Sequence, residues 1–350
     1  MILKNINLVN FRNYAQVNLN FDQSPTILVG NNGTGKSNVL ESIYFLSTTK
    51  SPRVELDSEL VKQETDFTRV EGEAEENGDQ NLLVLTMTDG NKTHFSKKVS
   101  VNGVGRKVID YIGIMPAVFF LPSDIEMVTG SPSLRRWHLD LGLAQVDSKY
   151  KRALTLYEQV LTSRNRILKR IREGLSRKDE LVYWTDELLV YGQIVSSRRK
   201  EFFDFANRLE KRLGNSDFEY LPSEVSSQKL EEYYNREIAS GVTLIGPHRD
   251  DFVLMQNNRN LAHFGSRGEQ REVTVAFKLT QLEHMAKVLG KRPILLLDDV
   301  FSELDATHRQ HVADVATYQQ TFISTIELEE VPKSLVDIAR ILRVEDGKVS

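Results

Sequence analysis

The chain has 350 residues and a formal net charge of −4, and a chain of this length is long enough for two or three lobes around a substantial core. It contains no cysteine, which excludes disulfides and cysteine-ligated zinc and fits a reducing compartment. Its first residues lack the apolar core of a signal peptide and no run of about 18 apolar residues follows, so we expect a cytoplasmic protein with no membrane partner.

The first motif is GNNGTGKSN, between an apolar run at Thr26 to Val29 and a helical pattern from Ser37 to Leu46. Its spacing is typical of a loop whose backbone N–H groups and following helix dipole bind the phosphates of a nucleoside triphosphate. Lys36 can reach the outer phosphates, and the Ser37 hydroxyl is suited to Mg²⁺. A glycine-rich turn that binds nothing is the alternative, but a strand and a helix flank the loop as a nucleotide site requires. The expected nucleotide contacts are Gly30, Asn31, Asn32, Gly33, Thr34, Gly35, Lys36, Ser37 and Asn38.

An antiparallel sheet is predicted from Thr68 to Val108. Apolar and polar residues alternate there, and turn signals stand at Asp89-Gly90 and at Asn102-Gly103. Alternation of period two with such dipeptides indicates β-hairpins.

A helical arm is predicted next. Apolar residues recur every seven positions from Leu181 to Leu209, and a second apolar stripe runs through Lys149 to Arg172. This period is typical of two long helices that pack on each other. Gly174 to Asp179 supplies the turn, and we expect Gly214 to Gln228 to be the irregular exit of the arm.

The arm is strongly basic. Between Lys149 and Leu213 there are 16 Lys and Arg against nine Asp and Glu, a local charge of +7 that leaves −11 for the remainder. Basic side chains on a face that packing leaves free favour contact with nucleic-acid phosphates, although a solvated helix face has the same composition. The candidate DNA contacts are Arg164, Arg166, Lys169, Arg170, Arg198, Arg199 and Lys200.

Two features near the C-terminus complete a predicted site. A buried strand at Ile294 to Leu297 ends in Asp298, placed to hold Mg²⁺ through water beside Ser37, and Asp299, placed to orient or deprotonate the attacking water. Upstream, Ser266 and a glycine precede an amphipathic helix whose N-terminus can bind a phosphate. Since Lys36 already holds the chain's own phosphate, we expect this helix end to clasp the nucleotide of a second copy; an ordinary capped helix is the alternative.

Several stretches together resemble the RecF family of SMC/ABC-type ATPases over nearly the full length. They are NFRNY, GNNGTGKSN, GSPSLRRWHLD, YEQVLTSRNRILK, GPHRDD, GSRGEQR and LLLDDVFSELD. The resemblance implies a protein that binds ATP with Mg²⁺, forms a homodimer on ATP, binds gapped or junction DNA and hydrolyses ATP very slowly. It also implies action with RecR, and through it RecO, to load RecA at single-strand gaps.

The resemblance also assigns residues. It makes Lys36 and Asp299 the catalytic pair, Ser37 and Asp298 the metal contacts, and places Arg12 near the nucleotide. A signature that meets ATP across the dimer matches Ser266, Gly268 and Gln270, and Asp305 matches the loop that couples the two sites. The chain departs from the family pattern at Pro122 to Asp124, at Trp137-His138 and at Lys50 to Arg53. The switch position near Thr325 holds no histidine, which is consistent with weak hydrolysis.

The predicted fold is α/β: an ABC/SMC-type P-loop ATPase head, with a mixed sheet and an antiparallel β subdomain, into which an α-helical arm is inserted. The predicted segments are residues 1–130 and 236–350 for the two halves of the head and residues 131–235 for the arm. A transporter-like ATPase subunit would share the loop, clasp and acidic strand without the arm. A nuclease-associated ATPase would need a metal-binding domain after the head. Both remain alternatives at this point.

Overall fold

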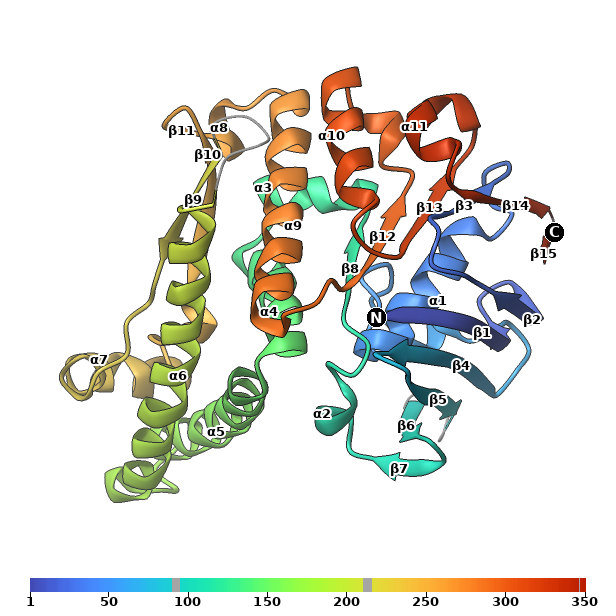
Figure 1. Ribbon diagram of the computed structural model, residues 1–350. Coiled ribbons are helices and arrows are strands. Elements are labelled where there is room, and N and C mark those ends of the chain that lie inside the picture. Colours follow the sequence, from blue (N-terminus) through green and yellow to red (C-terminus); the bar gives the residue numbers. More distant parts are fainter. Residues whose placement is uncertain (90–94, 210–215, 346) are drawn as a thin grey trace. The chain divides into compact units, whose positions relative to one another are not determined.

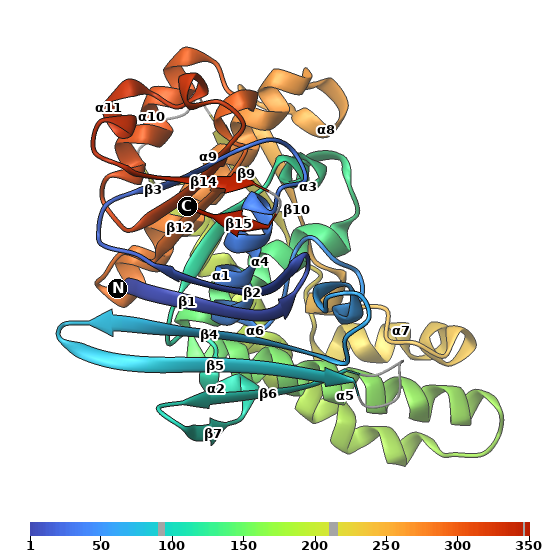
Figure 2. The same cartoon turned by 90° about the vertical axis from the view of Figure 1, so that its right-hand side faces the viewer.

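A computed structural model of the chain describes residues 1–89, 95–209, 216–345 and 347–350. It forms two compact units, one of Met1–Ile125 with Val275–Ser350 and one of Glu126–Thr274 (Figures 1 and 2). The segment 236–274, grouped with the head in the sequence analysis, lies in the second unit. None of the described helices combines the length and the apolar character that crossing a membrane requires.

The first unit contains a mostly parallel sheet with the strand order β15-β14-β3-β13-β12-β8. Strands β3, β8, β12 and β13 are buried along their whole lengths, which explains their continuous apolar runs, because parallel strands are covered on both faces. Only β15 runs antiparallel to its neighbour. The strands are β3 (Thr26–Val29), β8 (Ala117–Phe120), β12 (Ile294–Asp298), β13 (Thr321–Thr325), β14 (Arg340–Glu345) and β15 (Lys348–Val349).

The predicted antiparallel sheet is confirmed in the same unit, with the order β2-β1-β4-β5-β6-β7 (Figure 2). The Asn102-Gly103 turn joins β6 to β7 with positive φ at both residues, as a tight hairpin turn requires. An unpredicted turn of the same kind, Asn77-Gly78, joins β4 to β5. The predicted turn at Asp89-Gly90 extends outside the described residues. The strands are β1 (Ile2–Phe11), β2 (Tyr14–Asn20), β4 (Phe67–Glu76), β5 (Asp79–Asp89), β6 (Phe95–Val101) and β7 (Val104–Arg106).

Helix α1 (Lys36–Thr48) contacts strands of both sheets and is buried over most of its length. The described helices of this unit also include α2 (Val108–Tyr111), α10 (Ala306–Ala316), α11 (Lys333–Val336) and the part of α9 (Arg267–Leu289) from Val275 onward. The Pro-Ser-Asp departure from the family pattern places Asp124 in the interior, where its Oδ2 lies 3.0 Å from Lys278 Nζ. Burial raises the pKa of Asp124, against the opposing charge of Lys278. This aspartate therefore takes part in packing the unit.

The predicted helical arm is confirmed in the second unit as α5 and α6. Four of the five residues at seven-residue spacing, from Leu181 to Phe202, are buried, and the two helices pack on each other. The sheet of this unit has the order β11-β10-β9. The elements are α3 (Glu126–Thr129), α4 (Pro132–Val146), α5 (Ser148–Arg172), α6 (Val182–Ala206), β9 (Ser216–Leu221), α7 (Ser227–Ser240), β10 (Asp251–Gln256), β11 (Arg259–Asn260), α8 (Leu261–Phe264) and the start of α9 (Arg267–Leu289).

The prediction of an irregular exit at Gly214 to Gln228 is wrong. The described part of this segment contains β9, which pairs antiparallel with β10 from Ser216 to Leu221, and the start of α7. The alternation Phe218-Glu219-Tyr220 is a short period-two signal, but an edge strand of this length depends on its partner for stability.

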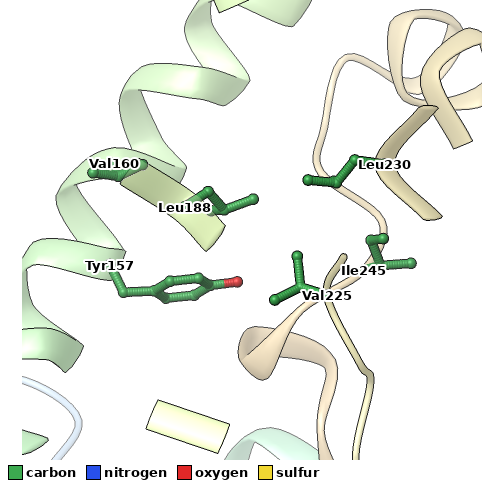
Figure 3. Packing of buried hydrophobic residues seen from close by; sticks show 6 residues of the cluster. All are labelled: Tyr157, Val160, Leu188, Val225, Leu230 and Ile245. Carbon is green, nitrogen blue, oxygen red and sulfur yellow. The ribbon is translucent and has the colours of Figure 1, made fainter. Parts of the chain in front are cut away.

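The arm is anchored by an apolar cluster. Figure 3 shows Tyr157 and Val160 of α5 with Leu188 of α6 facing Val225, Leu230 and Ile245. The last three residues come from α7 and from the segments beside it. The arm therefore packs on the rest of its unit through the same faces that its periodicity predicted to be apolar.

Arg164 is a correction to the predicted DNA contacts. Its side chain is only 2% exposed; Nη2 donates to Glu237 Oε2 at 2.7 Å and Nη1 donates to Thr243 Oγ1 at 2.7 Å. Arg164 stands seven residues after Tyr157, on the buried stripe of α5. Its charge is thus neutralised inside the unit and does not face an outside partner.

Arg199 is the second correction. It is also 2% exposed, and it donates from Nη1 to Asp250 Oδ2 at 2.8 Å and from Nη2 to Asp140 Oδ1 at 2.9 Å. Its Nη1 also donates to Pro247 O, and its Nε to Tyr150 Oη. Two carboxylates and one guanidinium therefore form a buried network that joins α4, α6 and the GPHRDD segment.

Two of the motifs that carry the family resemblance bind each other. In GSPSLRRWHLD, Arg135 forms two hydrogen bonds with the Asp251 carboxylate, at 2.7 and 2.9 Å, and Arg136 donates to Asp250 O at 2.7 Å. Bidentate arginine–carboxylate pairs fix geometry as well as charge. The two motifs thus hold the second unit together.

The buried ring of His248, in the GPHRDD segment, leads us to predict that the free energy of unfolding depends on pH. Tyr157 Oη lies 2.7 Å from its Nδ1, and Thr243 O lies 3.1 Å from its Nε2, a pairing that the neutral ring satisfies by accepting from the tyrosine. Burial, the largest cause, lowers the pKa of His248 to about 4. The unfolded chain therefore takes up this proton first, and up to about 3 kcal/mol of stability is lost as pH falls from about 6.5 to 4.

We expect urea titrations to give a smaller loss of unfolding free energy between pH 7 and pH 4.5 for His248→Gln than for the wild type. His263→Gln, at an exposed histidine, is the matched control and should follow the wild type. An identical pH dependence in His248→Gln and the wild type would refute the assignment.

Candidate nucleotide-binding site

The GNNGTGKSN loop joins β3 to α1 in a conformation that only glycine adopts easily. Gly33 and Gly35 have φ of 80° and 117°, in the region that side chains disfavour. A Cβ at Gly30 would lie 2.3 Å from Val344 O, and at Gly35 it would lie 2.6 Å from Tyr14 Oη. The loop is therefore built for close approach of backbone groups.

Lys36 lies across this loop. Its Nζ donates to Gly30 O at 2.6 Å and to Asn31 O at 2.8 Å. Burial lowers the pKa of Lys36, while the charges of Asp299 and Asp298 oppose that effect. The ammonium group is thus held at the mouth of the loop with two carboxylates close enough to act on it.

Ser37 and Asp298 meet although 261 positions separate them. Ser37 Oγ donates to Asp298 Oδ1 at 2.6 Å, and Ser324 Oγ donates to the same oxygen at 2.5 Å. Strand β13 lies between β3 and β12, all three parallel, so their carboxyl ends share one edge of the sheet. A hydroxyl and a carboxylate are the hard oxygen ligands that Mg²⁺ prefers, and such sites leave other positions to water and phosphate. These residues fit the predicted metal.

The backbone conformation and the surroundings of Asp299 are those expected of a general base. Its φ is 50°, its N–H lies 3.1 Å from both Ser324 O and Ser324 Oγ, and its buried Oδ1 has no hydrogen-bond partner among the described residues. Burial raises the pKa of Asp299, reinforced by the charges of Glu330 and Asp298. A carboxylate with raised proton affinity is a better base.

The NFRNY segment braces the loop from the side. Asn13 Nδ2 donates to Thr34 O at 3.2 Å, and Asn38 Nδ2 donates to Asn13 Oδ1 at 2.8 Å. The buried Tyr14 hydroxyl lies against Gly35, and burial raises the pKa of Tyr14, so the hydroxyl stays protonated. Arg12 binds Glu41 of α1 through two hydrogen bonds. Arg12 is thus anchored beside the loop.

The predicted signature lies in the second unit, at the start of α9. Ser266 Oγ accepts from Glu269 N at 3.3 Å, and Glu269 Oε2 accepts from Ser266 N at 2.8 Å, which is a capping box. Ser266 and Gly268 are exposed. Gln270 is buried and its Nε2 donates to Leu261 O at 2.9 Å, so the structure does not present this amide to an outside ligand. For Ser266 and Gly268 the nucleotide contact stays a prediction.

Asp305 lies in the segment that follows β12, and Thr325 is the last residue of β13. Asp305 caps α10: its Oδ1 accepts from His308 N at 2.9 Å, and its side chain is 63% exposed. Thr325 Oγ1 lies 2.7 Å from Glu330 Oε2. The position without a switch histidine is therefore occupied by a threonine that holds a carboxylate, Glu330, whose charge acts on Asp299.

The remaining DNA candidates lie on the surface of the arm. Arg166, Lys169, Arg170 and Lys200 are exposed. Arg198 is partly exposed and pairs with Asp147 and Glu201. Three of these four exposed candidates, Arg166, Lys169 and Arg170, therefore lie near the C-terminal end of α5.

A mostly parallel sheet that carries a phosphate loop and a pair of acids at one edge defines a P-loop ATPase head. The family model described as RecF/RecN/SMC N terminal domain matches residues 2–350. A protein of Halalkalibacterium halodurans named DNA replication and repair protein RecF is 34% identical over 373 residues, covering 100% of this chain and 99% of that protein. The chain belongs to the RecF family. This membership decides against the transporter-like and nuclease-associated alternatives.

Solved structures agree with this membership. A structure of the recombination mediator protein RecF-ATPrS in the RecFOR pathway is 28% identical, with a TM-score of 0.88, and covers 100% of this chain and 97% of that one. The Smc head domain from Pyrococcus furiosus, solved with an extended coiled coil, is 17% identical with a TM-score of 0.53 over 99% of this chain and 95% of that one. The latter likeness concerns the fold alone.

Sequence reasoning missed four residues of the site: Asn13, Glu41, Ser324 and Glu330. Asn13 stands inside NFRNY, and Glu41 is a lone carboxylate in the apolar run VLESIYFL, so both left a detectable signal. Ser324 lies near the carboxyl end of β13 and Glu330 follows that strand, and no local pattern marks either residue. The neighbouring strand, not the sequence around them, brings them to the site.

Proposed function

We propose that this chain is an ATP-dependent DNA-binding protein of recombinational repair and replication-fork maintenance in the cytoplasm. It dimerises on ATP, binds gapped or junction DNA and acts with RecR, and through it RecO, to load RecA at single-strand gaps. ATP hydrolysis is slow and serves to switch DNA binding. The observation that carries the proposal is the contact of Ser37 with Asp298 beside Lys36 and Asp299, in a chain of the RecF family.

The chemistry follows from the residues of this edge. Bound Mg²⁺ would be held by Ser37 and Asp298 and would neutralise charge on the outer phosphates. Lys36 binds those phosphates, and Asp299 takes or orients the proton of the attacking water. The strained φ of Asp299 fixes its carboxylate relative to β12.

Dimerisation is supported by the start of α9. Ser266 and Gly268 are exposed at the N-terminus of a 23-residue helix, where the helix dipole favours an anion. The anion bound by α9 of one copy would be the nucleotide that Lys36 of the other copy holds. Each site is complete only when two copies meet.

Light scattering tests this proposal. We expect the wild type to double its mass with ATP and Mg²⁺ and to bind a gapped duplex more tightly than without ATP. Lys36→Met should lose ATP binding and dimerisation, because the phosphates lose their cation. Ser266→Arg should bind ATP but remain a monomer, because the added side chain obstructs the contact between copies.

Ser226→Arg is the matched control. Ser226 caps α7 with similar geometry, accepting from Lys229 N at 3.2 Å, so this variant also loses an N-cap, worth about 1 kcal/mol, and gains the same charge. It should dimerise like the wild type. A dimer of Ser266→Arg that forms without ATP would contradict the proposal that ATP joins two copies through Ser266.

A further inference from the structure

Glu41 is a fully buried carboxylate that the reaction chemistry does not use. It lies in α1, five residues after Lys36, and is 0% exposed. Its two oxygens accept four hydrogen bonds: two from Arg12, at 2.8 and 2.9 Å, one from Arg53 Nη1 at 2.9 Å and one from Ser51 Oγ at 2.5 Å. Burial of a carboxylate is costly unless cations and donors compensate it, and here two cations do so.

The two guanidinium groups carry more positive charge than is needed to neutralise the Glu41 carboxylate. One carboxylate and two arginines leave a surplus of one positive charge. The arginine side chains are 19% and 28% exposed, whereas the carboxylate is not exposed at all. The surplus therefore lies on the outer side of the cluster. The hydrogen bonds of the Arg53 side chain to described residues run through Nη1, so its Nε and Nη2 form none with the described part of the chain.

The cluster is connected to the phosphate loop by direct contacts. Arg53 Nη1 donates to Asn38 Oδ1 at 3.0 Å, and Asn38 Nδ2 donates to Asn13 Oδ1 at 2.8 Å. Asn13 in turn donates to Thr34 O, inside the loop. Asn38 is the third residue of α1, so the arginine pair stands beside the helix end where the phosphates bind.

We propose that Glu41 is a positioning residue for nucleotide binding, which holds Arg12 and Arg53 beside the phosphate loop as a second cationic contact for the phosphate chain of a nucleoside triphosphate. The inference rests on the proposed function, since it requires that the loop binds ATP. Glu41 itself touches no ligand and acts through the two arginines.

The substitution Glu41→Gln separates positioning from simple charge. Removal of a negative charge beside an anion site would tighten ATP binding if charge alone mattered. If Glu41 positions the arginines, the neutral amide cannot accept both guanidinium groups, and ATP affinity falls by about tenfold. We expect equilibrium titrations with a fluorescent ATP analogue and Mg²⁺ to show the loss.

Two further variants make the test specific. Arg53→Gln should weaken ATP binding by a similar factor, and the double variant should be little worse than either single one, because both remove the same contact. Glu71→Gln is the matched control, since it breaks the exposed ion pair with Arg69 in the same unit, and it should bind ATP like the wild type. Thermal melts show which variants are folded.

The outcomes are distinct. Unchanged or tighter ATP binding by folded Glu41→Gln overturns the inference while wild-type ATP binding leaves the proposed function intact. If Glu41→Gln does not fold, Arg53→Gln decides, and wild-type affinity in that variant overturns the inference. A wild-type chain that fails to bind ATP overturns both proposals.

Discussion

Replacement of Asp299 by Asn is expected to reduce ATP hydrolysis by a factor of about 10² to 10⁴ while ATP remains bound. The amide preserves the size of the side chain but cannot accept a proton from water. The substitution leaves in place the Ser37–Asp298 pair and the phosphate contacts proposed for Lys36, so affinity for ATP should stay near that of the wild type. The dimer should therefore persist and release DNA more slowly. Single-turnover hydrolysis and DNA dissociation kinetics measure the two effects.

An exposed carboxylate provides the control. Glu329→Gln removes an exposed charge directly before Glu330 and should hydrolyse ATP like the wild type. Hydrolysis by Asp299→Asn at the wild-type rate would move the catalytic role to another residue. Loss of ATP binding in Asp299→Asn would instead show that the carboxylate contributes to the ground-state complex.

Replacement of Arg199 by Met is expected to destabilise the second unit by about 3–5 kcal/mol, because it leaves buried charge without its partner. The side chains of Asp250 and Asp140 both depend on this guanidinium, and Asp250 is itself 1% exposed. A loss of this size is a large fraction of the roughly 5–15 kcal/mol by which native proteins are stable. Chemical denaturation monitored by circular dichroism measures it, and wild-type stability would contradict the network.

In contrast to Arg199, the exposed cations of α5 should affect DNA binding and not stability. Changing Arg166, Lys169 and Arg170 together to Gln should leave stability unchanged but flatten the dependence of log K on log salt for duplex DNA by about three units. The matched control changes three exposed cations of the first unit to Gln: Lys98 in β6, Arg106 in β7 and Lys107 directly after it. Equal salt slopes for the arm variant and the wild type would show that these residues form a solvated surface that does not contact DNA phosphates.

The arm contains both buried and exposed arginines, so its local charge predicted only in part which cations face solvent. A count of charges between Lys149 and Leu213 treats Arg164 and Arg166 alike, although one is buried and the other is exposed. A signal existed: Arg164 falls on the heptad position that follows Tyr157, where an apolar residue is expected. A cation on a buried stripe indicates a buried partner, and Glu237 lies 73 positions further along the chain.

The sequence by itself determined the features whose physics is local. The phosphate loop needs glycines at positive φ between a strand and a helix, and those residues are contiguous from Gly30 to Asn38. The buried strand before Asp298 is marked by four successive apolar residues, and the arm by its seven-residue period. In each case the residues that satisfy the backbone or form the apolar face lie within a few turns of one another, so a pattern alone is sufficient.

Only the tertiary structure decided which distant groups meet. Ser37 reaches Asp298 because β3, β13 and β12 are parallel neighbours whose carboxyl ends share one edge, and strand order cannot be read from the strands one at a time. The same holds for the role of Glu330 beside Asp299, the burial of Arg199 and the pairing of β9 with β10. Each depends on partners supplied by another element, and the free energy of a buried charge or an edge strand is set by those partners and not by its own sequence.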